Sequence, residues 1–310
     1  MYKQQYLPEG LMRETSPDSE RFSLSALECA RDTGKILEAP AVRCSSTLDL
    51  LVDLGNVRGI IPKSEVAYVR DGAPKDIAAI SRVGKNVSFK VTDIYKDASG
   101  RLTAMLSRRE AQKECLCEHL LNLRSGDILT SRVTHLEPFG AFVDIGCGVV
   151  SLLPIDCISV SRISHPRDRF SIGDRIRVAV KSVDRANERI SVTHKELLGS
   201  WEENAALYSI GQTVTGIVRS IEDYGIFVEL SPNLAGLAET REDVRVGERA
   251  AVYIKNIIPE RMKVKLVIID CGEDTMRSPI EYFIPEDADH IGYWRYSPDE
   301  CRKVIETEFE

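Results

Sequence analysis

Short runs of alternating apolar and polar residues dominate the middle of the chain. Five such runs lie near residues 127–137, 139–146, 148–154, 175–183 and 188–193, and they are rich in Val, Ile and Phe. Gly, Pro, Asp and Asn separate the runs, and this pattern is typical of short β-strands. Five strands in so short a segment predict a small closed barrel, because closure removes exposed sheet edges.

The barrel unit is repeated along the chain. Three pairs of segments match: Gly126–Val133 with Gly211–Val218, Phe139–Val143 with Tyr224–Val228, and Gly173–Val180 with Gly247–Ile254. A fainter first copy starts at Gly34 and includes Gly84–Val91. Because repeats of this size indicate tandem domains, the sequence predicts an all-β fold of three five-stranded barrels.

Apolar residues have helical spacing in the segments between the copies, at 110–123 and 195–208, and before the first copy, at 23–31. We therefore expect short helical linkers between the barrels. The predicted parts are an N-terminal arm and helix (1–31), a degenerate first barrel (32–109), a helical linker (110–125), a second barrel (126–196), a second helical linker (197–209), a third barrel (210–270) and an acidic tail (271–310).

The two ends of the chain have different patterns. Prolines and a glycine interrupt residues 1–20, which we expect to be poorly ordered. In the tail, Ser297 and Glu300 have the spacing of a capping box with proline at the first helical position, which predicts a helix over about 298–308. A free acidic tail rarely holds large apolar residues such as Trp294, so we expect the tail to pack on the third barrel.

Two aromatic residues flank a glycine in the second copy. Phe139 and Phe142 would face opposite sides of a regular strand, because side chains alternate along it. A glycine bulge at Gly140 would place both rings on the outer face, with Asp144 also pointing outward. The third copy has the same arrangement around Gly225. The alternative is that one ring closes the interior of the barrel.

Composition indicates a globular protein. Of the 310 residues, 43% are hydrophobic and 29% are charged. No apolar stretch approaches the roughly 20 residues that span a bilayer, and no secretory signal is visible, so we expect a cytoplasmic location and no membrane partner. Of the eight scattered cysteines only Cys115 and Cys117 are close together, and no second pair stands at a spacing that suits zinc. The sequence therefore predicts no metal site and no cofactor.

The charge is unevenly distributed. The formal net charge is −7, and residues 271–310 alone, with 4 basic and 11 acidic side chains, account for a net −7. The rest of the chain is neutral overall, so a local basic face is compatible with it. No phosphate-binding glycine loop, nucleophile elbow or His-Glu-x-x-His motif occurs. We therefore expect neither an enzyme nor a small-molecule substrate.

The second copy resembles a known domain. The run from Gly126 through Phe139–Gly146 to Asp184 and Arg189 is similar to the S-one RNA-binding domain, which is a five-stranded OB-type barrel. The likeness is good over 126–196, fair over 211–270 and weak over 34–108. The whole arrangement resembles the bacterial ribosomal protein S-one family, and within it the short clostridial-type homologues.

The resemblance implies that single-stranded RNA stacks on the two aromatics beside the glycine. Such stacking contributes about 1–3 kcal/mol per base, and nearby basic side chains add a salt-dependent attraction. In the second copy the candidate RNA-binding residues are Phe139, Phe142, Asp184, Arg189, His165, Arg132, Lys181, Arg162, Arg167 and Arg169. In the third copy they are Tyr224, Phe227 and Lys263. The basic residues could equally form an ordinary solvated surface.

The first copy has Leu48 and Leu51 at the two aromatic positions, so we expect little RNA stacking there. The resemblance implies messenger RNA as the ligand, the 30S ribosomal subunit as a further partner and a role in translation. A second hypothesis stays open. In it, the protein is an adaptor whose first barrel and acidic tail contact other proteins, and RNA binding is secondary.

Overall fold

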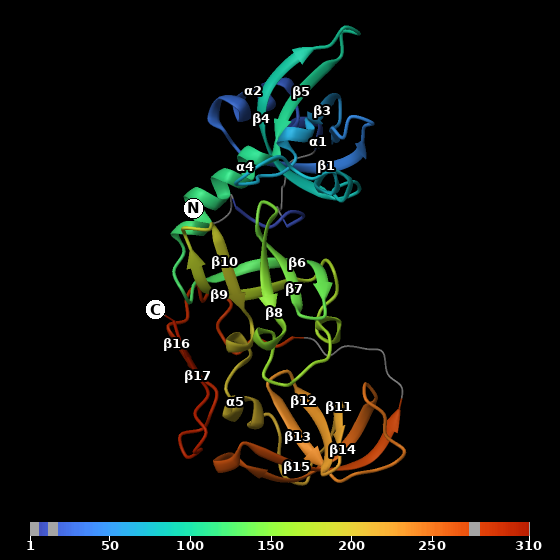
Figure 1. Ribbon diagram of the computed structural model, residues 1–310, viewed down its shortest axis with the longest axis vertical. Helices are drawn as coiled ribbons and strands as arrows, with labels where there is room; N and C mark the ends of the chain where they lie inside the picture. The colour runs from blue at the N-terminus through green and yellow to red at the C-terminus, as the bar shows by residue number, and fades with distance from the viewer. Residues whose placement is uncertain (1–5, 12–17, 273–279, 310) are drawn as a thin grey trace.

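Three closed five-stranded barrels follow one another along the long axis of the molecule in the computed structural model (Figure 1). The structure describes residues 6–11, 18–272 and 280–309. The predicted all-β architecture of three tandem OB-like barrels is confirmed. In each barrel the third strand pairs parallel with the fifth, and the first strand closes against the fourth.

The strands of each barrel are short and closely spaced. The first barrel contains β1 (Leu37–Cys44), β2 (Leu50–Leu54), β3 (Val57–Ile61), β4 (Asn86–Lys96) and β5 (Leu102–Ser107). The second contains β6 (Ile128–Glu137), β7 (Gly140–Gly146), β8 (Val149–Pro154), β9 (Arg175–Asp184) and β10 (Arg189–Thr193). The third contains β11 (Thr213–Glu222), β12 (Gly225–Ser231), β13 (Leu234–Ala238), β14 (Arg249–Ile258) and β15 (Lys263–Gly272).

Each barrel has its own apolar core. Every second residue of each strand points inward and contributes to it. In the second barrel Val143, Leu153 and Val192 are completely buried. Their neighbours Phe142, Leu152 and Ser191 face outward and are only partly buried. The outer faces are therefore free to carry polar and aromatic side chains without loss of core packing.

The helices are short. Two of them, α1 (Asp18–Arg21) and α2 (Leu24–Thr33), precede the first barrel, and α3 (Asp76–Ile80) lies between its strands β3 and β4. The other two connect the barrels: α4 (Arg108–Glu114) follows the first and α5 (Trp201–Ala205) follows the second. The predicted helix at 23–31 is confirmed, and α4 continues through a π-helical turn and a 3-10 turn to Asn122. The predicted helix over 195–208 is shorter, because a 3-10 turn ends before the capping box of Ser200 starts α5. None of the helices in the described parts is long and apolar enough to cross a membrane.

The prediction of a poorly ordered arm is wrong for residues 6–11, which we call the N-terminal segment. This segment lies between the first and second barrels (Figure 1). The Leu7 carbonyl accepts a hydrogen bond from Cys147 N at 2.9 Å, and Gly10 N donates to Glu38 Oε2 at 3.0 Å. Specific contacts with both barrels therefore hold the segment in place. Residues 1–5 and 12–17 lie outside the described residues.

The predicted helix over 298–308 is also wrong. Strand β16 (Tyr293–Arg295) pairs instead with β17 (Glu306–Glu308) in a small antiparallel sheet. Ser297 Oγ accepts a hydrogen bond from Ile305 N at 2.8 Å, so this side chain stabilises the connecting loop and not a helix start. Tyr293 is exposed and its neighbour Trp294 is buried, which is the two-residue alternation of a strand.

The expected packing of the tail on the third barrel is confirmed. Trp294 is 6% exposed and belongs to the core of the third barrel. The tail also contacts the second barrel, which the sequence did not predict. Tyr282 Oη accepts a hydrogen bond from Arg177 N at 2.8 Å, and Arg177 donates to the carbonyls of Pro285 and Ala288. The tail therefore joins the last two barrels.

Candidate nucleic-acid interface

The aromatic pair of the second barrel lies on its outer surface, as predicted. Phe139 is 55% exposed, and Phe142 is partly buried. Their ring centroids are 6.0 Å apart with an interplanar angle of 89°, which is an edge-to-face contact. The exposed face of Phe139 is therefore available to a flat aromatic ligand, and Phe142 supports it.

The cause of this arrangement differs from the prediction. The register shift between β6 and β7 lies at Val133 and His135, so the extra residue is in β6 and Gly140 pairs regularly with Pro154. Phe139 precedes β7 in a tight turn, where strand alternation does not apply. Gly140 allows β7 to pair closely with β8, because a Cβ atom at this position would lie 2.5 Å from the Leu153 carbonyl oxygen.

His135 belongs to the same surface, although the sequence did not single it out. It is the cross-strand partner of Phe142, and the two ring centroids are 6.2 Å apart. The side chain is exposed, and its Nε2 lies 2.7 Å from Glu137 Oε1. Only the register of β6 against β7 reveals this neighbour, because the bulge changes the residue that faces Phe142.

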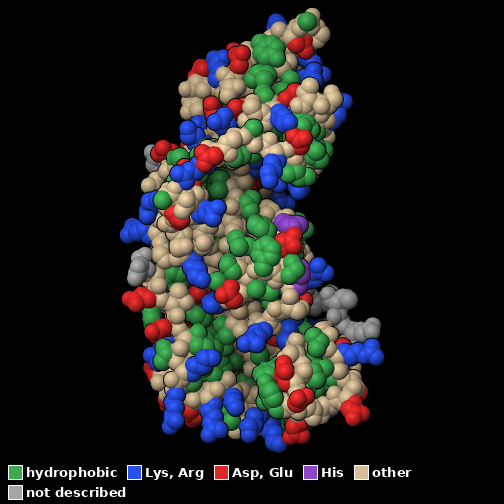
Figure 2. Space-filling view, viewed as in Figure 1, with side chains coloured by type: hydrophobic (Ala, Val, Ile, Leu, Met, Phe, Trp, Pro, Cys, Tyr) green, Lys and Arg blue, Asp and Glu red, His purple; other side chains and the backbone are tan. Residues whose placement is uncertain are grey.

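The outer face continues across β8 to β10. Phe142 pairs with Leu152, and Leu152 pairs with Ser191. Val150 and Arg189, each two residues earlier on these strands, share that face and are exposed. We call His135, Phe139, Phe142, Val150 and Arg189 the aromatic platform. Figure 2 shows apolar side chains with a neighbouring histidine on this barrel.

Asp184 and Arg189 form the closing pair of the β9–β10 hairpin, as the resemblance implied. The Asp184 carboxylate accepts hydrogen bonds from the backbone N and Nδ2 of Asn187 at 3.0 and 2.7 Å. These bonds hold the pKa of Asp184 below its usual value. Asp184 thus shapes the turn that presents Arg189.

The remaining basic candidates are spread over several places. Arg162 and Arg167 are exposed in the loop after β8. His165 Nδ1 accepts hydrogen bonds from Arg167 N and Nε at 3.1 and 3.2 Å. Lys181 lies on β9, with its Nζ 3.4 Å from Cys157 Sγ, away from the aromatic pair.

Two arginines are placed differently from the prediction. Arg169 is buried, and its guanidinium donates to both carboxylate oxygens of Glu229 in the third barrel, at 2.7 and 2.9 Å. Arg169 therefore joins the second barrel to the third and is not one of the exposed basic side chains that could contact RNA. Arg132 turns toward the junction with the first barrel, where its Nη1 donates to the carbonyl of Glu9 in the N-terminal segment at 2.9 Å.

The third barrel repeats the aromatic geometry. The rings of Tyr224 and Phe227 are 6.1 Å apart at an angle of 88°, and Tyr224 is 70% exposed. Lys263 faces Ile258 across the last hairpin, where the second barrel has Arg189 and Asp184. The third barrel therefore repeats the aromatic pair of the second, but Ile258 replaces the acid that faces the basic residue across the hairpin. The turn itself carries the exposed Glu260 and Arg261.

The first barrel lacks this surface. Leu51 occupies the register position of Phe142, because it pairs with Ile60 as Phe142 pairs with Leu152. Leu48 is partly buried and has a positive φ of 66°. Neither side chain offers an aromatic face. Among the described residues, no group of three His, Cys, Asp or Glu side chains could hold a metal ion.

Comparison with known proteins places this geometry in a family. Residues 122–195 match the model of the S1 RNA binding domain. The small ribosomal subunit protein bS1 homolog of Bacillus subtilis is 30% identical over 299 residues, which cover 94% of this chain and 74% of that protein. The chain belongs to the bS1 family.

The bS1 protein of Mycobacterium tuberculosis is 32% identical over 263 residues, which cover 78% of this chain. The chain spans about half the length of this mycobacterial bS1 relative, at 52%. A solved multidomain protein with nucleic acid binding domains from Streptococcus pneumoniae aligns over 78% of this chain at 16% identity and a TM-score of 0.25. The family membership rests on the bS1 sequences.

Proposed function

We propose that this bS1-family protein binds single-stranded RNA on the aromatic platform of the second barrel and works in translation. The observation that carries the proposal is the exposed edge-to-face pair of Phe139 and Phe142 beside Arg189. Every base has a flat π-face, so such a surface accepts single strands with little regard to sequence. Ser191 on β10 lies two strands from Phe142 on β7, and Arg189 is two residues farther along β10. At about 4.8 Å per strand and about 3.3 Å per residue, the backbones of Arg189 and Phe142 are about 12 Å apart, so the long side chain of Arg189 can reach a phosphate of the stacked strand.

The test is a Phe139→Ala/Phe142→Ala variant of the full chain, titrated with a labelled uridine-rich RNA. Loss of two stacked bases at about 1–3 kcal/mol each predicts at least about tenfold weaker binding. The matched control is Ile77→Ala/Ile80→Ala, which removes two exposed apolar side chains from α3 in the first barrel. Circular dichroism checks that both variants are folded. Unchanged affinity in the folded platform variant contradicts the proposal.

We further propose the small ribosomal subunit as a partner, because the relatives carry that name. Co-sedimentation of the full chain with purified small subunits tests this partner separately from RNA binding. If the platform variant still co-sediments while it loses RNA affinity, the two surfaces differ. If neither protein co-sediments, the ribosomal part of the proposal fails and the RNA-binding part stands on its own titration.

A further inference from the structure

A polar cleft of about 300 Å³ lies between the first and second barrels. The N-terminal segment, the turn before β4 and strand β6 form its walls. Three basic side chains line it: Arg82 and Lys85 from the first barrel and Arg132 from the second. Its volume is at the lower end of the range of ligand pockets, roughly 300–1,000 Å³.

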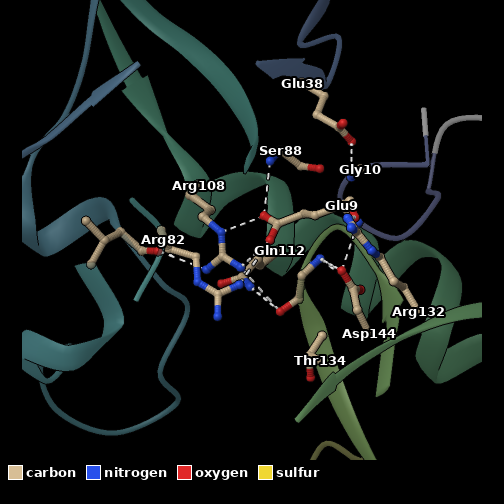
Figure 3. Close-up of polar contacts among 12 residues, drawn as sticks. Glu9, Gly10, Glu38, Arg82, Ser88, Arg108, Gln112, Arg132, Thr134 and Asp144 are labelled. Carbon is tan, nitrogen blue, oxygen red and sulfur yellow. Dashed lines mark hydrogen bonds and ion pairs between the residues drawn. The ribbon is translucent and has the colours of Figure 1, made fainter. Parts of the chain in front are cut away.

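The carboxylate of Glu9, which also lines the cleft, already has its partners. Glu9 is 5% exposed, and its Oε1 accepts hydrogen bonds from Arg108 Nε at 2.6 Å and from Ser88 N at 3.1 Å (Figure 3). The charge of Arg108 lowers the pKa of Glu9, so the carboxylate is ionised and neutralised by that buried arginine. Arg82 Nη1 approaches Glu9 Oε2 only to 3.4 Å.

The second acid of the cleft, Asp144, is also fully engaged. Its carboxylate accepts backbone hydrogen bonds from Glu9 N at 2.8 Å and from Gly146 and Gly148 at 2.9 and 3.0 Å. Burial and the nearby charge of Glu9 raise the pKa of Asp144. Both carboxylate oxygens of Asp144 accept backbone N–H groups, and within the described residues no hydrogen bond or ion pair joins Asp144 to the three cations.

The cations are less well neutralised. Within the described parts of the chain, Lys85 takes part in no ion pair. Burial and the positive charges of Arg82 and Arg132 lower its pKa, as expected where cations crowd together. The guanidinium of Arg132 donates hydrogen bonds to the carbonyls of Glu9 and Gly173. One cation from the first barrel and one from the second therefore face the cleft without a carboxylate of their own.

The cleft adjoins the aromatic platform along β6. Thr134 lines the cleft, and the next residue, His135, belongs to the platform. Arg132 is three residues from His135, which is about 10 Å along a strand at about 3.3 Å per residue. An OB-fold binds roughly 4–16 nucleotides, so a strand stacked on the platform is long enough to reach the cleft.

We infer that this cleft is a phosphate subsite, in which Lys85, Arg82 and Arg132 bind backbone phosphates of the RNA strand that leaves the aromatic platform. The inference rests on the proposed function for the identity of the ligand. It assigns a role in RNA binding to the first barrel, which has no aromatic pair. It also explains why Arg132 faces the junction and not the aromatic rings.

The test uses the full chain with Lys85→Gln, a substitution of an exposed side chain that leaves the buried Glu9 and Arg108 intact. Two uridine oligomers are compared, one of about 5 nucleotides that fills the platform and one of about 15 that extends beyond it. Lys85→Gln is expected to weaken binding of the longer oligomer about two- to fivefold, as for loss of one exposed ionic contact. The slope of log affinity against log salt should fall by about 0.7.

Controls separate the possible outcomes. Lys96→Gln removes an exposed charge from the distal β4–β5 hairpin (Figure 1). This variant is expected to bind both oligomers with the wild-type affinity and the wild-type salt slope. If Lys85→Gln binds the longer oligomer with the wild-type slope while Phe139→Ala/Phe142→Ala still weakens both oligomers, the subsite is refuted and the platform stands. If Lys85→Gln weakens binding of inorganic pyrophosphate but not of RNA, the cleft binds a free anion and the inference is wrong.

Discussion

Asp144 and Glu229 lie at the same position of successive barrels, two residues after Phe142 and Phe227, and each is buried at a junction. Asp144 accepts a hydrogen bond from Glu9 N in the N-terminal segment. Glu229 binds Arg169 from the second barrel and Arg219 from its own. The same strand that presents an aromatic residue to the surface therefore attaches its barrel to the preceding part of the chain.

The junction of the last two barrels depends on Arg169. Replacement by Ala leaves the buried Glu229 with Arg219 as its only basic partner, and breaking a buried ion pair costs about 3 kcal/mol or more. We expect Arg169→Ala to lower the free energy of unfolding of the third barrel by about this amount. Both tryptophans belong to that barrel's core, so their fluorescence in urea reports on it. Arg162→Ala, an exposed arginine of the same loop, serves as control, and equal stabilities of the two variants would contradict the prediction.

Acid should weaken the contact between the tail and the second barrel through His194. This side chain is buried, with its Nδ1 2.8 Å from the Ile158 carbonyl oxygen and its Nε2 3.4 Å from Tyr282 Oη. Burial, and then the charge of Arg169, lower the pKa of His194 from 6.5 to about 4. The unfolded chain therefore binds a proton below pH 6.5 that the folded protein does not, so stability is present above pH 6.5 and is lost toward pH 4.

The measurement compares wild type with His194→Gln, which cannot titrate, in urea at pH 7.5 and pH 5. At about 1.4 kcal/mol per pH unit below pH 6.5, the shift predicts that wild type loses about 2 kcal/mol more than the variant between these two pH values. Identical pH dependence of wild type and His194→Gln would show that His194 does not carry the effect.

The third barrel should bind RNA more weakly because of two acids beside its exposed ring. Glu222 and Asp223 are exposed and directly precede Tyr224, whereas a glutamate and a proline precede Phe139. In a Phe139→Ala/Phe142→Ala background, we expect Glu222→Gln/Asp223→Asn to raise RNA affinity about two- to tenfold at low salt. The gain should shrink at 0.15 M salt, where the Debye length is about 8 Å. Asp299→Asn/Glu300→Gln in the tail is the matched control. An equal gain in RNA affinity from this control would show that net charge, and not the position beside Tyr224, causes the effect.

The barrels and their aromatic residues were readable from the sequence because both follow short-range rules. Strand alternation and the turn glycines repeat three times, and the two aromatics around a glycine were expected on the outer surface, where Phe139 and Phe142 lie. The contact of His135 with Phe142 was not readable, because a single extra residue in β6 sets it.

The junctions were not predictable, because their partners are far apart in the chain. Glu9 is one acid in an irregular segment, and Arg108, which neutralises it, is 99 residues away. Ser297 and Glu300 had the local pattern of a helix start, but pairing of β16 with β17 determined the structure of the tail. Long-range burial and pairing outweigh a local capping preference of about 1 kcal/mol.

The buried contact between Arg169 and Glu229 has a consequence for long RNA. It helps hold the second and third barrels together, so their two aromatic pairs keep a fixed separation. Once a strand stacks on one pair, its binding to the other is governed by an effective concentration and no longer by the amount of free RNA. Avidity of this kind can reach 10²–10⁴ over either site alone. Affinity is therefore expected to rise in a step at the oligomer length that first spans both barrels.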